Sequence, residues 1–566
     1  NLSRVFSDKN NISVEEQSLK PVFPVFYSWY NDNSFGTIEV CNEEDSSITD
    51  VVVYFYQQQY MGQPRDCAKA KSLKKGEKLT VDLKAFFNEN MLSLNEKSDT
   101  LANIIVEYKY LGAKRSETFS MVVPVYGRNN MSWEDDRCAS AFVSSKDPAA
   151  MWFAKYVTST VRDDIRSGVP QNIQYAMAVF QALDQFGINY VKDPTSAFED
   201  NVGTASIDFL QFPYQTLMYR GGDCDDLSIL TCSLFESIGI KTAFITIPWH
   251  IFMAFDSGLS LAQATEYFDS LDNFIVDGNK VWVPLEITLS DEGFNKAWHK
   301  GAWEWNTANR TGDAMIYPME ESWKIYKPVS VPGAAAKFTL PEETLVAKSF
   351  SAMVDEFVIA QITPQIASFE NLLVKAPTAQ NYNDFGILYA RYGLFEQAEE
   401  QFRLARISKY LPSILNTANL YYSQKDYTKA AAWYKQVLAA DSNNNLAMLG
   451  LARCAYETGD YNECDKWYGT VYKNDRTLAK QYSYLGAFEQ TSGRSFSLAD
   501  RLENTVWVQS AEYNMRNGVI TSVVPVVPNA SVTPQTSAVV LQTSEPVENA
   551  DGIETIVTPV AIAPGN

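Results

Sequence analysis

A glycine-rich loop passes into a helical pattern at Tyr219-Arg-Gly-Gly-Asp-Cys-Asp-Asp-Leu-Ser-Ile-Leu230. Its two glycines and Asp223 can form a turn that caps a helix opening at Cys224. A cysteine at a helix N-terminus lies at the positive end of the macrodipole, which lowers the pKa of the thiol. Asp223, Asp225 and Asp226 oppose this effect unless they are turned away or paired. A thiolate at Cys224 would therefore need a cationic imidazole beside it.

The chain contains only two histidines, which narrows the choice of that imidazole. His250 ends the strand-like run Ala243-Phe-Ile-Thr-Ile-Pro-Trp-His, 26 residues after Cys224. Glu286 ends a second strand-like run, Val281-Trp-Val-Pro-Leu-Glu, 36 residues further along the chain. We predict a catalytic triad in which Cys224 is the nucleophile, His250 is the general base and Glu286 fixes the imidazole tautomer.

Three motifs around these residues resemble those of bacterial transglutaminase-like proteins. They are Gly222-Asp-Cys-Asp-Asp-Leu-Ser, Trp249-His250 and Trp282-Val-Pro-Leu-Glu286, and Gln211-Phe-Pro-Tyr-Gln-Thr-Leu resembles the lead-in to the cysteine. The resemblance spans about residues 147 to 326 and implies a papain-like α+β fold with amide-bond chemistry through a thioester. Most bacterial members are regarded as proteases or amidases. Glu286 stands where an aspartate is commoner in this family.

The oxyanion of such a reaction needs hydrogen-bond donors, and the backbone N–H of Cys224 is one candidate. The side-chain candidates are Gln211 and Gln215, between which the spacing does not choose, and Tyr214 is a further option. His299 lies in Ala297-Trp-His-Lys without a partner carboxylate, and we predict a surface or packing role for it.

No cofactor or metal is predicted. Two separated histidines and the lack of a Cys-x-x-Cys pair give no zinc site. The cluster Asp223–Asp226 lacks the alternating oxygen ligands of a calcium loop. Cys232, Cys454 and Cys464 are predicted to pack in the core. The remaining cysteines, Cys41, Cys67 and Cys138, could pair if the protein is exported.

The N-terminal third has β character. We expect residues 1–20 to be a loose polar leader and residues 21–130 to be an immunoglobulin-like β-sandwich. Its strand signals include Val51–Tyr56, Leu79–Leu83 and Ile104–Tyr110, all rich in β-branched or aromatic residues.

The α+β domain is expected to span residues 131–330. Helical spacing at 147–166 and 169–186 precedes strand-like runs at 242–247 and 280–287 and a tryptophan-rich helix at 294–305. Trp298, Trp303 and Trp305 could floor a substrate cleft, although a buried helix face is the simpler interpretation.

A repeat follows a predicted linker with a helix at 331–376. Ala398, Phe402 and Ala405 recur as Ala430, Tyr434 and Val437, and again as Cys464, Tyr468 and Val471. This pattern resembles the tetratricopeptide repeat and predicts an all-α solenoid over residues 377–490, which could bind peptides or act as a rigid spacer. We predict that the low-complexity tail, residues 491–566, is mostly disordered or serves as an extended partner-binding strand.

The composition limits the partners. A net charge of −21 argues against nucleic acid or an anionic membrane as the main partner. No apolar run is long enough to span a bilayer. The chain begins at Asn1, which fits a cleaved export signal or a trimmed chain.

These features favour an exported cysteine hydrolase of the periplasm or cell envelope that acts on a peptide or isopeptide amide. A second hypothesis is a non-catalytic envelope scaffold that binds protein partners through its repeats, β domain and tail. A third is a protein-glutamine acyltransferase, which shares the triad and differs in its acceptor.

Overall fold

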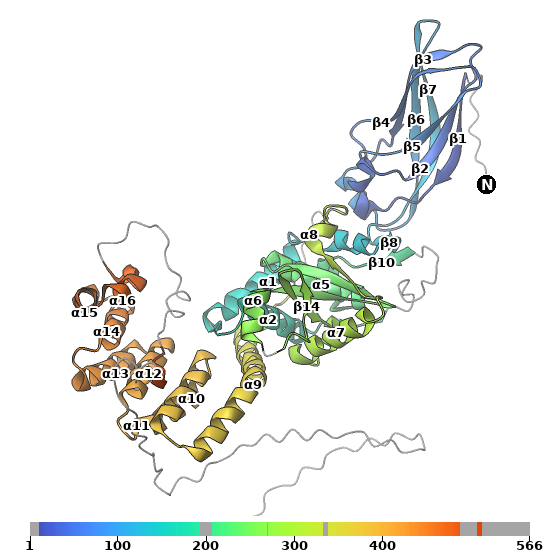
Figure 1. The fold of residues 1–566 in the computed structure, drawn as a ribbon. Coiled ribbons are helices and arrows are strands. Elements are labelled where there is room, and N and C mark those ends of the chain that lie inside the picture. Colours follow the sequence, from blue (N-terminus) through green and yellow to red (C-terminus); the bar gives the residue numbers. More distant parts are fainter. Residues whose placement is uncertain are drawn as a thin grey trace, which may run out of the picture.

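The computed structural model describes residues 11–166, 168–192, 207–268, 270–331, 338–486 and 507–511. A β-rich part, a mixed part around one central sheet and a series of helices follow one another along the chain (Figure 1). No helix in these residues is long and apolar enough to cross a membrane. All seven cysteines lie in the described ranges and are free thiols.

Two antiparallel sheets form the N-terminal part, with strand orders β1-β2-β5 and β4-β3-β6-β7. Buried residues alternate with more exposed ones along β6, so one face of its sheet packs on a core. The strands predicted at 51–56, 79–83 and 104–110 are confirmed. The strands are β1 (Ile12–Leu19), β2 (Gly36–Asn42), β3 (Ile48–Tyr56), β4 (Arg65–Leu73), β5 (Lys78–Leu83), β6 (Ser98–Tyr110) and β7 (Ala113–Val125).

Strand β1 departs from the expectation of a loose leader. It runs antiparallel to β2, from Ile12 opposite Asn42 to Leu19 opposite Gly36. Only Ile12 of this strand is fully buried, and the others are part-buried or exposed. An edge strand of this kind needs little apolar alternation, because it is held by backbone hydrogen bonds to its one neighbour. Its polar sequence therefore gave no strand signal.

The central part contains a five-stranded antiparallel sheet in the order β14-β15-β13-β12-β16. Its strands are β12 (Thr242–Ile247), β13 (His250–Ser260), β14 (Ile275–Asp277), β15 (Lys280–Leu285) and β16 (Met315–Pro318). Its helices are α1 (Pro148–Val161), α2 (Gln171–Phe186), α4 (Pro213–Tyr219), α5 (Cys224–Ser237), α6 (Leu261–Tyr267), α7 (Phe294–Asn309) and α8 (Met319–Ser322). Short strands β8 (Asn130–Ser132), β9 (Asn189–Tyr190), β10 (Ile207–Phe209) and β11 (Gly221–Gly222) lie outside this sheet.

Helix α5 is buried along nearly its whole length. It contacts β13 of the sheet on one side and α1 and α4 on others, so polar and apolar positions alike are covered. Asp223 caps its N-terminus by accepting a hydrogen bond from the backbone N–H of Asp226, as the sequence predicts. The first residue of this buried helix is Cys224, which is therefore held in place by the core.

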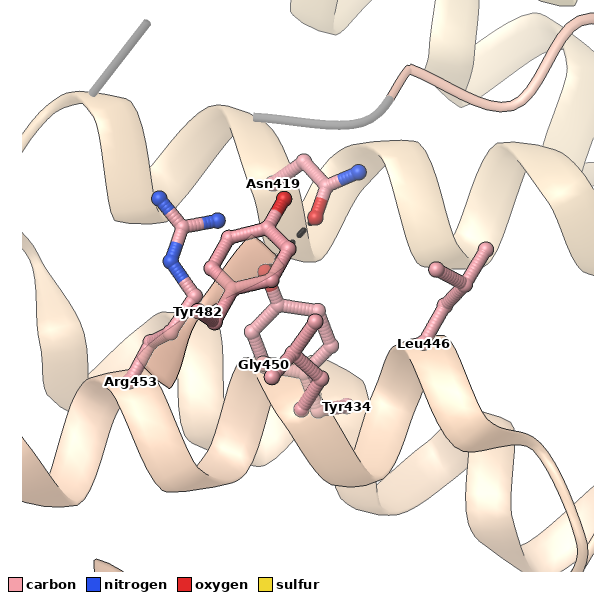
Figure 2. A pocket seen from close by; sticks show the side chains of 7 residues that line it. Asn419, Tyr434, Leu446, Gly450, Arg453 and Tyr482 are labelled. Atoms are coloured by element: carbon pink, nitrogen blue, oxygen red, sulfur yellow. Dashed lines mark hydrogen bonds between the residues drawn. The ribbon is translucent and has the colours of Figure 1, made fainter. Parts of the chain in front are cut away.

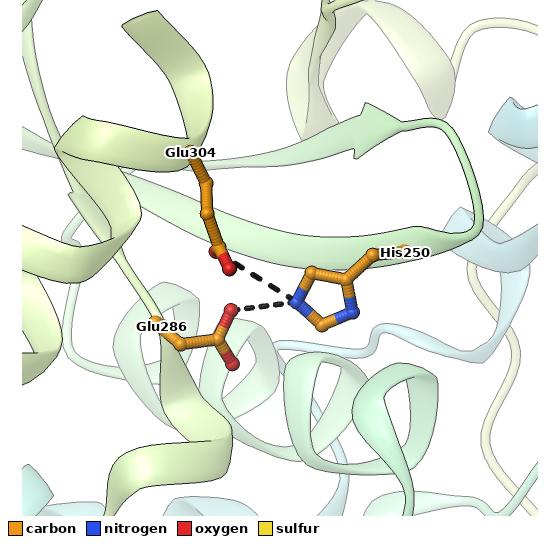
Figure 3. A group of neighbouring side chains, drawn as sticks. All are labelled: His250, Glu286 and Glu304. Atoms are coloured by element: carbon orange, nitrogen blue, oxygen red, sulfur yellow. Dashed lines mark hydrogen bonds and ion pairs between the residues drawn. The ribbon is translucent and has the colours of Figure 1, made fainter. Parts of the chain in front are cut away.

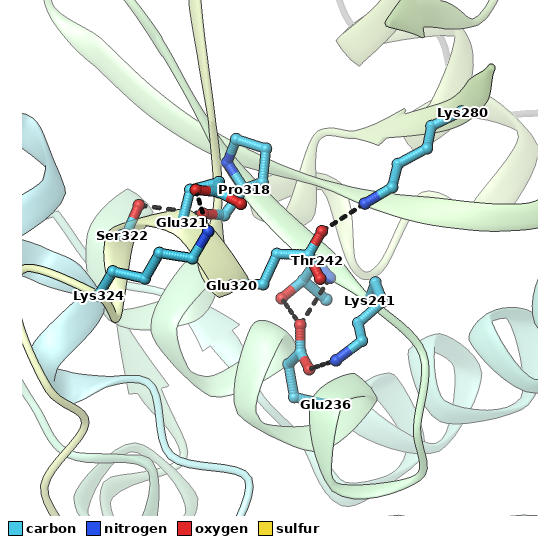
Figure 4. Close-up of polar contacts among 9 residues, drawn as sticks. All are labelled: Glu236, Lys241, Thr242, Lys280, Pro318, Glu320, Glu321, Ser322 and Lys324. Carbon is cyan, nitrogen blue, oxygen red and sulfur yellow. Dashed lines mark hydrogen bonds and ion pairs between the residues drawn. The ribbon is translucent and has the colours of Figure 1, made fainter. Parts of the chain in front are cut away.

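Polar contacts fix the opposite end of α5 (Figure 4). The carboxylate of Glu236 accepts hydrogen bonds from the backbone N–H (2.8 Å) and hydroxyl (3.0 Å) of Thr242, the first residue of β12. Nearby, Lys280 of β15 pairs with Glu320 of α8 at 2.5 Å. These contacts tie the helix and the strands together, so the positions at the other end of α5 are fixed relative to the sheet.

The C-terminal part begins with the long helix α9 (Glu343–Lys375), which packs against α1 and α2. Arg166 pairs with Asp355 of α9 at 2.6 Å across this contact. Consecutive helices then pack in pairs. They are α10 (Ala379–Arg391), α11 (Phe395–Arg406), α12 (Leu411–Ser423), α13 (Tyr427–Ala440), α14 (Asn445–Glu457), α15 (Tyr461–Asn474) and the short α16 (Arg476–Gln481).

The predicted repeat positions are all buried between these helices, as the pattern requires. They are Ala398, Phe402, Ala405, Ala430, Tyr434, Val437, Cys464, Tyr468 and Val471. Position 386 of α10 has to be glycine, because a Cβ there would lie 2.6 Å from the ring of Phe402. Of the predicted tail, residues 507–511 are described and pack against the repeats, whereas the rest lies outside the described residues.

Candidate active site

Sheet register brings His250 and Glu286 together. His250 is the first residue of β13, and Glu286 follows the last residue of β15. The two strands are antiparallel neighbours with Met253 opposite Leu285, so the start of one and the end of the other meet at the same edge. Strand pairing, which a linear sequence cannot display, thus closes the 36-residue separation.

The hydrogen bond between them is short and protected. Nε2 of His250 lies 2.6 Å from Oε2 of Glu286 (Figure 3). Glu286 is 2% exposed, and its other oxygen accepts hydrogen bonds from the backbone N–H and hydroxyl of Thr288. This arrangement holds the proton on Nε2 and leaves Nδ1 as the ring nitrogen that can accept one.

The charges of this pair shift both pKa values. Burial lowers the pKa of His250, but the hydrogen bond and charge of Glu286 outweigh it, and the net pKa is raised. Burial raises the pKa of Glu286, but the hydrogen bond and charge of His250 outweigh it and hold that pKa below its usual value. Each partner thus stabilises the charged form of the other.

A tight turn sets the position of the histidine. Ile247 pairs with His250, so Pro248 and Trp249 alone connect β12 to β13. Trp249 has a φ of 68°, in the left-handed region that bulky residues rarely adopt. The tryptophan side chain is half exposed, next in sequence to the histidine. An exposed aromatic surface therefore adjoins the candidate site.

The thiol of Cys224 lies beside the same strand. The backbone N–H of Ile251, the residue after His250, lowers the pKa of the thiol, and the charge of Glu286 raises it. The structure therefore brings His250 and Glu286 together and places Cys224 at the start of the helix that packs on β13. The catalytic role of the three residues stays a prediction. Cys224 itself is 8% exposed, so only a small part of it reaches the surface.

Burial changes the expected ionisation of Cys224. The pKa of the thiol is raised by burial first and then by the charges of Asp225 and Asp223, against the lowering effect of the Ile251 N–H. This direction is opposite to the one predicted from the helix N-terminus. The raised pKa favours the protonated form of the thiol.

Burial and the closeness of like charges raise the pKa of two of the three aspartates at the start of α5. Burial and a hydrogen bond with Asp223 raise the pKa of Asp225 well above its usual value. Burial and the charge of Asp223 raise the pKa of Asp226 to about 8. At neutral pH the cluster thus carries much less negative charge than three free carboxylates would. The sequence could not show this, because it depends on burial.

Within the part of the chain that the structure describes, two groups of side chains have donor atoms close enough to share a cation. They are Asp223, Asp225 and Asp226, and His250, Glu286 and Glu304, each with its donor atoms within 4.8 Å of one another. Hydrogen bonds within and around each group engage some of these atoms. The absence of a metal therefore stays a prediction.

The side chains proposed for the oxyanion are engaged elsewhere. The Gln211 amide donates to Asp226 at 2.6 Å and to the carbonyl of Gly221 at 3.3 Å. Gln215 caps α4 and exchanges hydrogen bonds with Asn129. Tyr214 accepts a hydrogen bond from Arg128 at 3.2 Å. The oxyanion role of Gln211 or Gln215 stays a prediction.

Glu304 is a site residue that the sequence analysis missed. It lies on α7, 4.0 Å from Nε2 of His250, and forms an ion pair with Lys300 at 2.9 Å (Figure 3). Burial and the neighbouring charge of Glu286 raise its pKa to about 7. The available signal was the Lys300–Glu304 spacing of four residues on one helix face. It was overlooked because the tryptophans dominate this helix.

The other residues considered for this region fall into packing or surface positions. His299 is exposed and its Nδ1 lies 2.6 Å from the carbonyl of Asn295, as expected for a surface histidine. Trp298 is buried and donates to the carbonyl of Asn273, whereas Trp303 is 58% exposed beside Glu304. Of the three tryptophans, Trp303 is therefore the one whose exposure suits contact with a substrate.

Comparison with known proteins concerns the helical part. Residues 421–484 match the tetratricopeptide repeat family. The match runs from within α12 to the end of the helical series, so the C-terminal part contains these repeats and suits protein–protein interaction. No match to the chain is found among curated proteins.

Proposed function

We propose that residues 131–330 form a transglutaminase-like domain and act as a cysteine hydrolase on peptide or isopeptide amides. The observation that supports the proposal is the buried 2.6 Å hydrogen bond between His250 and Glu286, at the start of the strand on which the helix beginning at Cys224 packs. A buried imidazole–carboxylate pair beside a thiol has few structural reasons to exist, whereas a nucleophile needs such a base.

The chemistry proceeds in two halves. His250 takes the thiol proton at Nδ1 while the sulfur attacks the carbonyl carbon of the amide. The C–N bond then breaks as His250 returns the proton to the leaving nitrogen, which yields an amine and a thioester. Water attacks the thioester with His250 again as base, and a carboxylic acid leaves while the thiol is restored. Glu286 stabilises the imidazolium in both halves.

Alkylation tests the acid–base coupling without a known substrate. Iodoacetamide is added to the full chain over a range of pH, and modification of Cys224 is measured by peptide mass spectrometry. We expect His250→Asn to slow alkylation near neutral pH at least tenfold, because the thiol pKa is raised and the base is lost. Buried Cys232 serves as an internal control that should stay unmodified. Identical pH profiles in the two proteins would refute the proposal.

A related activity is acyl transfer from glutamine to an amine, which uses the same triad with a different acceptor. A labelled primary amine supplied with a glutamine-containing protein distinguishes the two. Acyl transfer predicts incorporation of the label together with release of ammonia, whereas hydrolysis of a peptide or isopeptide amide predicts no incorporation and release of an amine-terminated fragment.

The flanking parts would place this chemistry. We propose that the two N-terminal sheets form an immunoglobulin-like spacer and that the protein acts in the periplasm or cell envelope after export. The repeats favour a scaffold role as well, because helical repeats commonly hold protein segments. If His250→Asn leaves Cys224 chemistry unchanged, binding through the repeats becomes the main function.

A further inference from the structure

A short piece of the tail lies on the repeats. Residues 507–511 are described in contact with the repeat helices, 20 residues (487–506) beyond the last described residue of the helical series. Val508 is 7% exposed and joins the core cluster of α12 to α14, and Ser510 is 4% exposed. This burial distinguishes the piece from a strand that merely passes over a surface.

Two buried asparagines bind its backbone. The side chain of Asn416 on α12 accepts a hydrogen bond from the N–H of Val508 at 2.9 Å and donates to its carbonyl at 3.0 Å. Asn383 on α10 donates to the same carbonyl at 3.1 Å and accepts from Asn416 at 2.9 Å. Both asparagines are fully buried. A side-chain amide that pairs with both backbone groups of one residue imitates a neighbouring β-strand, which recognises an extended peptide of any sequence.

Side-chain contacts add selectivity on either side of Val508. The hydroxyl and N–H of Ser510 both donate to Oδ1 of Asp384 at 2.9 Å, and the hydroxyl also lies 3.2 Å from the carbonyl of Gln380. At the other end, the Trp507 ring stacks on Phe402 with centroids 6.3 Å apart and an angle of 19°. Burial raises the pKa of Asp384, so this carboxyl needs the donors that Ser510 supplies.

We propose that the face formed by α10 and α12 is a peptide-binding site whose built-in ligand is residues 507–510. The partner it fits is an extended protein segment with an aromatic residue, then a β-branched residue, then any residue, then a serine or threonine. Such a partner has to displace the built-in ligand, which keeps the site closed until the partner is abundant. This inference goes beyond the proposed hydrolase and does not depend on Cys224.

The same face of α12 continues beyond Asn416. Asn419 lies one helical turn after Asn416 and accepts a hydrogen bond from the hydroxyl of Tyr434 at 2.6 Å. It borders a pocket between α12 and α14, which Figure 2 shows; its lining also includes Leu446, Gly450, Arg453 and Tyr482. This pocket is about the size of one water molecule, so a partner competes with the built-in segment through its concentration and its contacts with Asn416 and Asp384.

Peptide binding to the full chain tests the proposal. The probe is a fluorescent peptide of residues 503–513, and the readout is fluorescence anisotropy. The double variant Val508→Asp with Ser510→Asp should release the built-in segment. Val508→Asp places a charge at a buried position, and Ser510→Asp places a carboxylate against that of Asp384. We expect the probe to bind this variant at least about tenfold more tightly than wild type, because a tethered competitor acts at a millimolar effective concentration.

Matched variants sharpen the result. Gln509→Ala should behave like wild type, since Gln509 lies between the two anchoring residues and has no hydrogen bond to the described repeats. Adding Asn416→Ala to the double variant should weaken probe binding at least tenfold. Circular dichroism checks that this variant keeps its helices. Equal probe affinity for wild type and the double variant, or no binding to either, would overturn the proposal.

Hydrogen exchange provides a second measurement that needs no variant. The amides of Val508 and Ser510 should exchange slowly in the wild-type chain, to the same extent at low and high protein concentration. Fast exchange at both amides would overturn the proposal. Protection that appears only at high protein concentration, together with a dimer in sedimentation, would mean that the segment binds a second copy of the chain. That result would overturn the proposal that each chain's own segment is the ligand.

Discussion

The buried carboxylate of Glu286 offers the sharpest test of the candidate site. Replacing it by glutamine keeps the shape of the side chain and removes the charge that raises the pKa of His250. Without that charge, burial of the imidazole dominates, and the pKa of His250 should fall. The protonated imidazole formed after it takes the thiol proton then lacks its partner, so Glu286→Gln should slow every step in which His250 acts as base.

The size of the effect follows from the geometry. The Nε2–Oε2 bond is 2.6 Å long and Glu286 is 2% exposed, so water cannot replace the lost charge. Loss of one partner from a buried charge-assisted hydrogen bond costs about 1.5–3 kcal/mol, which corresponds to about 10- to 150-fold in rate. In the unsubstituted chain, burial and the charge of Glu286 raise the pKa of Glu304 to about 7. Glu286→Gln removes this repulsion, which offsets part of the loss. We therefore expect the lower half of this range.

Two measurements check the prediction together. Alkylation of Cys224 by iodoacetamide gives the rate, and nuclear magnetic resonance of the imidazole C–H groups gives the titration of the histidines. Because the chain has only two histidines, exposed His299 provides an internal reference that Glu286→Gln should leave unchanged. If His250 titrates at the same pH in both proteins, the carboxylate does not act on the imidazole and the reasoning fails.

Because the pKa of His250 is raised, its basic form prevails only above the ordinary histidine value of about 6.5. Alkylation of Cys224 should therefore keep increasing with pH beyond that point, and a rate that is already independent of pH below pH 6 would contradict this. Gly386→Ala should lower the free energy of unfolding by about 1–3 kcal/mol, because its Cβ would lie 2.6 Å from the ring of Phe402. Gly469→Ala is the matched control: an added Cβ there has nothing within 4 Å, so the variant should be neutral or stabilised by up to about 1 kcal/mol. Urea denaturation compares the two variants. Asp147 caps α1 by accepting hydrogen bonds from two backbone N–H groups. Asp147→Ala should therefore lower the free energy of unfolding by about 1–2 kcal/mol, and Asp147→Asn should lower it much less. Equal melting temperatures for the two variants would exclude the cap.

Much of the fold could be predicted because local patterns and burial agree. Strand β12 has the predicted bounds, and helices α5 and α7 begin at the predicted residues. Caps and β-branched runs are local signals that a sequence displays directly. Strand β1 was missed because its outer positions are polar and its stability comes from pairing with β2. Pairing with one neighbour leaves no periodic trace in the sequence.

The candidate site was predicted in part. The motifs around Cys224, His250 and Glu286 pointed to the pair His250 and Glu286, which the fold brings together, whereas the catalytic role of the three residues stays a prediction. The sequence suggested a lowering effect of the helix N-terminus and a raising effect of the aspartates on the Cys224 pKa, but it could not show the largest cause, burial, which is a tertiary property and raises the pKa. Glu304 and the contacts of residues 507–511 were missed for a similar reason, since both depend on elements that meet only in the folded chain.

Helix α9 connects the central part to the repeats. Its buried residues up to Ile362 face the central part, and beyond Pro364 its Phe369 stacks on Phe385 of α10 with ring centroids 5.1 Å apart. The chain just after α10 returns to the central part, where Arg166 donates a hydrogen bond to the carbonyl of Tyr392 at 3.3 Å. The first repeat helix is thus held both by α9 and by the central part itself, so a segment bound on α10 would keep one orientation relative to the central sheet.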